Sequence, residues 1–141
     1  MTYKKSLLLT AAFFALTLHV SYALADDLPD VQQEGNITYI TGGIGDDEKM
    51  ALEAVRVNYN FQLLSAYTTG EYTGDTHITL SDMNGNYVMD SDAGPLFYAQ
   101  LPVGRYEVEA TSGGEIKKQI VTIRRGKTSS VTFRWPYNEA R

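Results

Sequence analysis

Alternation of apolar and polar residues through the second half of the chain is the feature that most restricts its fold. Tyr106, Val108 and Ala110 alternate with charged residues, and the same period of two recurs over residues 76–80 and 131–135. Because a β-strand turns successive side chains to opposite faces, this pattern predicts strands with one face in a core and one face in water. The chain is therefore expected to be mainly β.

Turn residues recur about every ten positions among these segments and set the predicted architecture. Asn84-Gly85 predicts a type I′ hairpin, since both central residues of that turn need positive φ. Pro102 and Gly104 predict a second turn, and Gly113-Gly114 a third. Short strands with this spacing predict an antiparallel seven-stranded β-sandwich, of prealbumin-like or immunoglobulin-like type.

One helix is expected before the strands, over about residues 46–58. Three acidic residues open this segment, where a helix N-terminus favours negative charge, and a broad apolar stripe follows. The predicted organisation is a removable segment over residues 1–25, a mobile leader over 26–36, a single sandwich domain over 37–136 and a tail over 137–141.

The N-terminus resembles an export signal. Lys4 and Lys5 precede an apolar run over residues 7–20, and Ala23-Leu24-Ala25 fits an A-x-A cleavage site. Cleavage after Ala25 would leave a periplasmic or secreted protein with no stable membrane anchor. An uncleaved anchor is less well supported, because the apolar run is shorter than the ~20 residues that a membrane-spanning helix needs.

Charge is distributed unevenly along the chain. Residues 26–92 carry 13 acidic residues against Lys49 and Arg56, whereas residues 93–141 carry eight basic residues against four acidic ones. The two halves either neutralise each other within the fold or form a polarised surface that docks a charged partner. The acidic balance argues against nucleic acid as the partner.

Motifs for catalysis and cofactor binding are weak. The chain has no cysteine, and His77 is the one histidine beyond the export segment, so neither a thiol site nor a multi-histidine zinc site is expected. The glycine-rich loop over residues 42–45 leads into acids that would repel a phosphate. We therefore expect no enzymatic activity, no catalytic residue, no cofactor and no resident metal.

An oxygen-rich cluster over residues 82–92 leaves one alternative open. It contains three aspartates and two asparagines, the ligand types that Ca²⁺ prefers. The spacing departs from the EF-hand pattern, because Gly85 comes one place early and Ala93 stands where a glutamate is needed. A hairpin turn is the favoured interpretation, and a calcium- or small-ligand-dependent accessory domain is the second alternative.

Tyrosines are the candidate ligand-binding residues. Aromatic rings in a sandwich mostly fill the core, but exposed rings can stack on sugar faces. Those near strand ends or opposite the expected core are Tyr67, Tyr72, Tyr98 and Tyr137.

Two segments carry a resemblance to a known family. Residues 79–88 read TLSDMNGNYV and residues 101–110 read LPVGRYEVEA. Over residues 75–135 the chain resembles a carboxypeptidase regulatory-like module, the transthyretin-like, Cna-B-like or starch-binding-like β-sandwich. The preceding segment, with its glycine-rich loop, expected helix and Tyr59-Asn60, resembles small exported proteobacterial proteins that contain a single such module. The resemblance implies the fold and no catalysis, because the H-x-x-E zinc motif of the metallocarboxypeptidases is missing.

The expected function is that of a non-catalytic binding or scaffolding module of the bacterial cell envelope, which acts by surface contact with another protein. Edge strands that accept a partner strand are one route to such contact. A carbohydrate-binding module that uses exposed aromatic residues is the alternative. The partner is accordingly an envelope protein or a glycan, and the sequence leaves the oligomeric state open.

Overall fold

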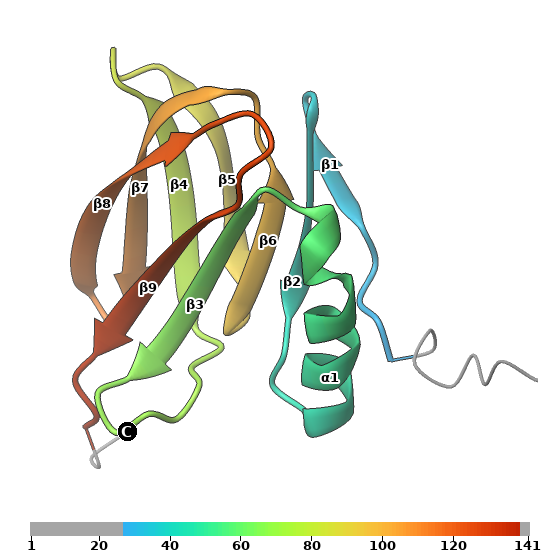
Figure 1. The fold of residues 1–141 in the computed structure, drawn as a ribbon. Coiled ribbons are helices and arrows are strands. Elements are labelled where there is room, and N and C mark those ends of the chain that lie inside the picture. Colours follow the sequence, from blue (N-terminus) through green and yellow to red (C-terminus); the bar gives the residue numbers. More distant parts are fainter. Residues whose placement is uncertain (1–26, 139–141) are drawn as a thin grey trace, which may run out of the picture.

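The computed structural model describes residues 27–138, which form two β-sheets packed face to face and one helix (Figure 1). The elements, in chain order, are β1 (Gln32–Glu34), β2 (Ile37–Gly42), α1 (Asp46–Val55), the 3₁₀-helix η2 (Arg56–Asn58), β3 (Phe61–Tyr67), β4 (Thr76–Asp82), β5 (Tyr87–Ala93), β6 (Leu96–Gln100), β7 (Gly104–Ser112), β8 (Glu115–Ile123) and β9 (Ser129–Trp135). Sheet A has the strand order β1-β2-β6-β3-β9, and sheet B has the order β5-β4-β7-β8. The predicted class, a mainly β sandwich with one short N-terminal helix, is confirmed.

Two details of the predicted architecture differ. The described residues form nine strands instead of seven, and β9 pairs with β3 in parallel, from Phe61 opposite Ser129 to Tyr67 opposite Trp135. After β8 the chain leaves sheet B and enters sheet A beside β3. A period of two is the same in parallel and antiparallel strands, so the direction of this pair depends on the path of the chain and not on local pattern.

The segment expected as a mobile leader, residues 26–36, contains β1. Gln32 to Glu34 pair antiparallel with β2, and Gly35 supplies a positive φ of 57° at the turn between the two strands. The Tyr87 hydroxyl donates a hydrogen bond to the Glu34 carboxylate from the neighbouring sheet. The three residues of β1 are all polar and show no alternation that would predict a strand. β1 therefore forms because β2 lies beside it and pairs with it.

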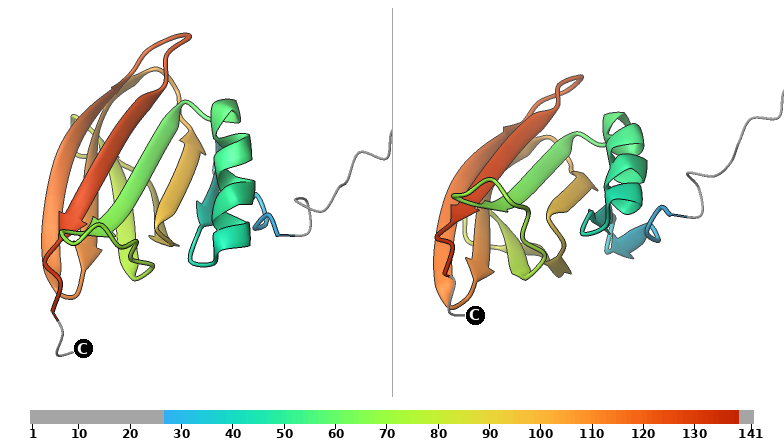
Figure 2. Two further views of the ribbon diagram at one scale, coloured as in Figure 1. Left: turned by 60° about the horizontal axis from the view of Figure 1, so that its bottom comes forward. Right: turned by 90° about the horizontal axis from the view of Figure 1, so that it is seen from below.

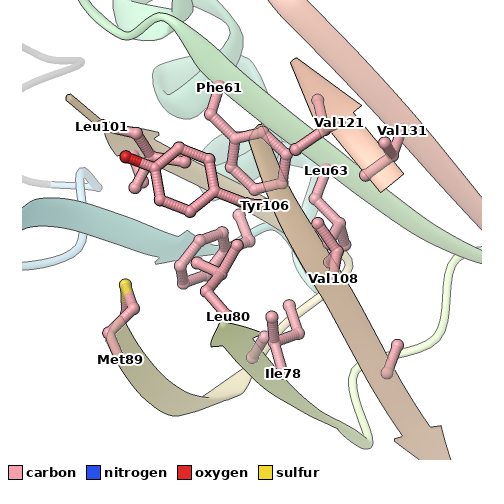
Figure 3. Close-up of a cluster of buried hydrophobic side chains, with 14 of the residues drawn as sticks. Phe61, Leu63, Ile78, Leu80, Met89, Leu101, Tyr106, Val108, Val121 and Val131 are labelled. Carbon is pink, nitrogen blue, oxygen red and sulfur yellow. The ribbon is translucent and has the colours of Figure 1, made fainter. Parts of the chain in front are cut away.

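The main core lies between the two sheets, and the inward sets predicted from alternation form it. Ile78 and Leu80 of β4 are fully buried, as is Val108 of β7, and Phe133 of β9 is nearly so. Figure 3 shows how these β4 and β7 side chains meet Phe61 of β3 from the opposite sheet. Alternation therefore predicted the inward faces of β4, β7 and β9 correctly.

The helix covers part of the outer face of sheet A (Figure 2). Leu52 of α1 packs on Ile40, Leu96 and Tyr98, and these four residues form a second core outside the sandwich. Because β6 has the main core on one side and the helix on the other, its first four residues are all buried. The expected helix over residues 46–58 corresponds to α1 followed by η2.

The hairpin between β4 and β5 is present, but its predicted type I′ turn is wrong. Gly85 has a φ of 81°, whereas in the described residues no residue other than glycine has a positive φ, so Asn84 does not fit that turn. Instead, the Asp82 carboxylate accepts hydrogen bonds from the backbone N–H groups of Asn84 and Asn86, at 2.9 Å each. This Asx-type bonding closes a longer loop with a single left-handed glycine.

The expected export segment, residues 1–25, lies outside the described residues, as do positions 139–141 of the predicted tail. Within residues 27–138, no helix has the length and apolar character needed to cross a membrane.

Candidate functional site

The four candidate tyrosines fall into two separate pairs. Tyr72 and Tyr98 line a cavity of about 220 Å³ beside α1, and Tyr67 and Tyr137 line another of about 210 Å³ near the end of β9. Only Tyr137 is exposed, at 47%. The four rings therefore do not form one continuous stacking platform.

The first pair belongs to the packing between the helix and sheet A. Tyr98 is 4% exposed and packs with Leu52 in the second core. Burial raises the pKa of the Tyr98 hydroxyl to about 12, with a further contribution from the Glu53 carboxylate. The Lys49 ammonium lies 4.5 Å from the centre of the Tyr72 ring. These contacts account for both rings without a ligand.

The second pair is more open. The Tyr67 and Tyr137 rings meet edge to face with their centres 5.3 Å apart. Glu115 and Asn138 line the same cavity, so that hydrogen-bonding groups stand beside the rings. An aromatic surface next to a carboxylate and an amide has the chemistry for binding one sugar ring.

Carboxylates flank His77 on the outer face of sheet B. Its Nδ1 lies 2.8 Å from Asp92 Oδ1, and its Nε2 lies 3.0 Å from Asp90 Oδ2. The hydrogen bond to Asp92 raises the pKa of His77, and the charge of Asp90 adds to this effect. The Tyr87 hydroxyl, which has a single proton to donate, lies within hydrogen-bonding distance of both Asp90 and Glu34, and these two carboxylates raise its pKa.

These contacts divide the oxygen-rich cluster over residues 82–92 into two local groups. Asp82 bonds to its own turn, and this bonding lowers the pKa of its carboxyl, whereas Asp90 and Asp92 bond to His77. Across residues 27–138, no three histidine, aspartate or glutamate side chains are grouped as a metal would need. The bonding of Asp82 therefore fits the hairpin interpretation.

One end of the sandwich gathers basic and aliphatic residues from three separate turns. An open cavity of about 540 Å³ is lined there by Val57 after the helix, Val103 between β6 and β7, and Arg124, Arg125 and Lys127 between β8 and β9. Val57 is 79% exposed and Val103 is 66% exposed. No acidic side chain lines this cavity. We call this surface the basic end.

The loop between β2 and α1 lies at the opposite end of the strands (Figure 1). An open cavity of about 590 Å³ is lined there by Asp75, Asp92 and the 78%-exposed Ile44. Asp46 and Asp47 follow Ile44 at the start of α1 and are also exposed. Neither lysine nor arginine lines this cavity. We call this surface the acidic end.

The sequence showed that charge is uneven along the chain, but it did not predict that these residues gather at the two ends of the sandwich. Val57 belongs to the apolar stripe that predicted the helix, and that stripe gave no indication that this side chain is exposed at the end of the sandwich. Val103 lies between Pro102 and Gly104 in a predicted turn, and an aliphatic side chain at a turn tip was the available signal. Which turns meet at one end depends on the strand order of the sheets.

The free edge of β9 is partly occupied by side chains of β8. Lys117 Nζ donates to the backbone oxygen of Arg134, and Gln119 Nε2 donates to that of Thr132 at 2.7 Å. A partner strand would have to displace both donors. Addition of a partner strand at β9 is therefore disfavoured.

Comparisons with known proteins give little beyond the fold. No protein-family model matches the sequence, and no curated protein matches it either. Two solved structures of BcpA, the major pilin subunit of Bacillus cereus, are similar over 52% of this chain and 28% of the pilin chain. A point variant of that subunit gives a TM-score of 0.43 at 18% identity, and the other structure gives 0.39 at 15%. The similarity is a distant one between β-sandwich domains, and membership of the carboxypeptidase regulatory-like family stays a prediction.

Proposed function

We propose that the chain is a non-catalytic β-sandwich module, exported to the bacterial cell envelope, that binds another protein through its basic end. The observation that carries the proposal is the grouping of Arg124, Arg125 and Lys127 around exposed Val57 and Val103 in one open cavity. Exposed aliphatic groups ringed by charge resemble an interface, where apolar contacts lie at the centre and polar groups at the rim.

The charges and apolar side chains of the basic end indicate what kind of protein surface it can bind. Arginine binds carboxylates through two parallel hydrogen bonds, and the cavity lining offers no acid of its own to satisfy Arg124 and Arg125. Exposed Val57 and Val103 would be removed from water by an apolar patch on the partner. An acidic protein surface with an aliphatic centre satisfies both requirements, and such contacts weaken as salt screens the charges.

A capture experiment with matched variants tests the proposal. The protein recovered after expression of the full chain serves as bait for envelope proteins of the source cell, at 50 and 300 mM salt. We expect one defined acidic protein, captured at low salt and lost with Arg124→Gln/Arg125→Gln. The control Lys118→Gln/Arg134→Gln removes the same charge elsewhere and should retain capture. Equal capture by both variants would contradict a role for the basic end.

Glycan binding is a second candidate, because Tyr67 and Tyr137 share a cavity with Glu115 and Asn138. A sugar ring stacked there should change the protein's fluorescence. We expect Tyr137→Ala to abolish that change and Tyr87→Ala, which removes an exposed ring outside the cavity, to preserve it. A panel of peptidoglycan fragments and polysaccharides that leaves the emission unaltered would remove this candidate.

A further inference from the structure

We infer that the partner of the basic end is a second copy of this chain, which docks through its acidic end, so that the molecules join head to tail. The inference rests on the proposed function, because it names the partner of the same surface. It is argued from the matching chemistry of the two ends and from their positions in the fold.

Each end has an aliphatic centre, with arginine and lysine around it at one end and aspartate around it at the other. At the acidic end, Ile44 is 78% exposed and stands beside Asp75 and the start of α1. At the basic end, Val57 and Val103 stand beside the arginines of the β8–β9 turn. Each surface therefore offers what the other one lacks, an opposite charge around an apolar contact.

Charges of the opposite sign also lie near each end. At the acidic end, His77 lies between Asp90 and Asp92, so that group carries a net negative charge even when the imidazole is protonated. The Lys49 ammonium lies over the Tyr72 ring. On the side of the basic end, Asp82 accepts hydrogen bonds from the backbone amides of its own turn and keeps its negative charge, but it does not line the cavity. The sign of each surface is therefore set by the charged residues that line its cavity.

The positions of the two ends determine the kind of assembly. They lie at opposite ends of the strands, as the β8–β9 turn and the β2–α1 loop show in Figure 1, so one molecule cannot bring them together. Contact between unlike surfaces leaves one basic end and one acidic end free in every dimer. Association therefore continues beyond the dimer, into longer chains or a closed ring, whereas pairing of two basic ends or two acidic ends is opposed by repulsion.

Sedimentation velocity of the protein recovered after expression of the full chain tests the inference. At 20 mM salt we expect monomer, dimer, trimer and longer species that increase with protein concentration, and at 500 mM salt mostly monomer. A single monomer peak up to 1 mM at low salt would overturn the inference. If Arg124- and Arg125-dependent capture of an envelope protein persisted in that case, the proposed function would stand without it.

Two neutralised variants give the decisive mixing experiment. Arg124→Gln/Arg125→Gln weakens only the basic end and Asp47→Asn/Asp75→Asn only the acidic end. Each should associate about tenfold more weakly with itself, since an exposed charge pair contributes about two- to fivefold. An equimolar mixture joins the intact end of each variant and should stop at a one-to-one dimer.

Controls separate this result from loss of the fold. Thermal melting checks that both variants remain folded, and Lys118→Gln/Arg134→Gln should assemble like the wild type. Association of the basic-end variant alone at wild-type strength, or a mixture that forms long chains, would show that another surface mediates the contact.

Discussion

Replacing Gly94 by alanine tests how closely the chain packs between β5 and β6. A Cβ atom built on Gly94 would lie 2.7 Å from both the Cα and the carbonyl oxygen of Gly42 in β2. Real Cβ atoms do not approach other heavy atoms so closely, and both obstacles are backbone. Gly94 has no positive φ, so alanine suits its backbone conformation and the cost is purely steric.

The size of the effect follows from the contacts that must give way. Bringing the Cβ to an ordinary separation moves the two backbones apart by roughly 1 Å, and overpacking of this kind costs about 1–3 kcal/mol. The same movement stretches the 2.9 Å hydrogen bond from the Gly94 amide to Thr41 Oγ1, whose loss adds about 1 kcal/mol. We expect Gly94→Ala to lower the free energy of unfolding by about 2–4 kcal/mol.

Urea unfolding followed by tryptophan fluorescence measures this change, because Trp135 is the single tryptophan and is buried in the main core. The matched control is Gly45→Ser, where a Cβ meets nothing within 4 Å and serine favours the N-cap position that Gly45 occupies. This control should be neutral or slightly stabilising. A Gly94→Ala protein within 0.5 kcal/mol of the wild type, at the same slope, would refute the close approach.

Three further predictions concern the second core, His77 and the turn before β7. Leu52→Ala should cost about 2–5 kcal/mol of unfolding free energy, because Leu52 is fully buried, whereas Met50→Ala on the exposed side of α1 should cost under ~0.5 kcal/mol in the same urea assay. NMR titration should find the pKa of His77 above 6.5, and Asp92→Asn should lower this pKa. The contribution of His77 to stability is then complete at a pH below its pKa in the unfolded chain, and is lost as the pH rises through its pKa in the folded protein. Tyr106→Phe removes a 2.7 Å hydrogen bond to the Pro102 carbonyl and should cost about 1 kcal/mol, and a variant as stable as the wild type would show that this bond is not needed.

Local pattern was sufficient wherever a feature depends on near neighbours in the chain. Alternation around Val108 and Phe133 predicted which side chains face the core, and the acidic start of α1 predicted the helix. Asn84-Gly85 predicted the hairpin. The predicted turn type was wrong, because the Asp82 carboxylate accepts hydrogen bonds from the backbone amides of Asn84 and Asn86. These properties are set within a few residues of each position.

Pairing between distant segments could not be predicted in this way. β1 has three polar residues and becomes a strand only because β2 offers a free edge, and β9 lies parallel to β3 only because the chain crosses from one sheet to the other. Tyr98 shows the same limit: alternation gave it an outward position, and α1 then covered that face.

The sequence by itself determined the mainly β class, the inward faces of β4, β7 and β9, the helix and the imbalance of charge along the chain. Only the tertiary structure decided that Val57, Val103 and Arg125, from three different turns, meet at one end while Ile44 and Asp75 meet at the other. The physical reason is that the face of a strand repeats every two residues, whereas the neighbours of a turn depend on strand order, which is fixed by packing over the whole chain.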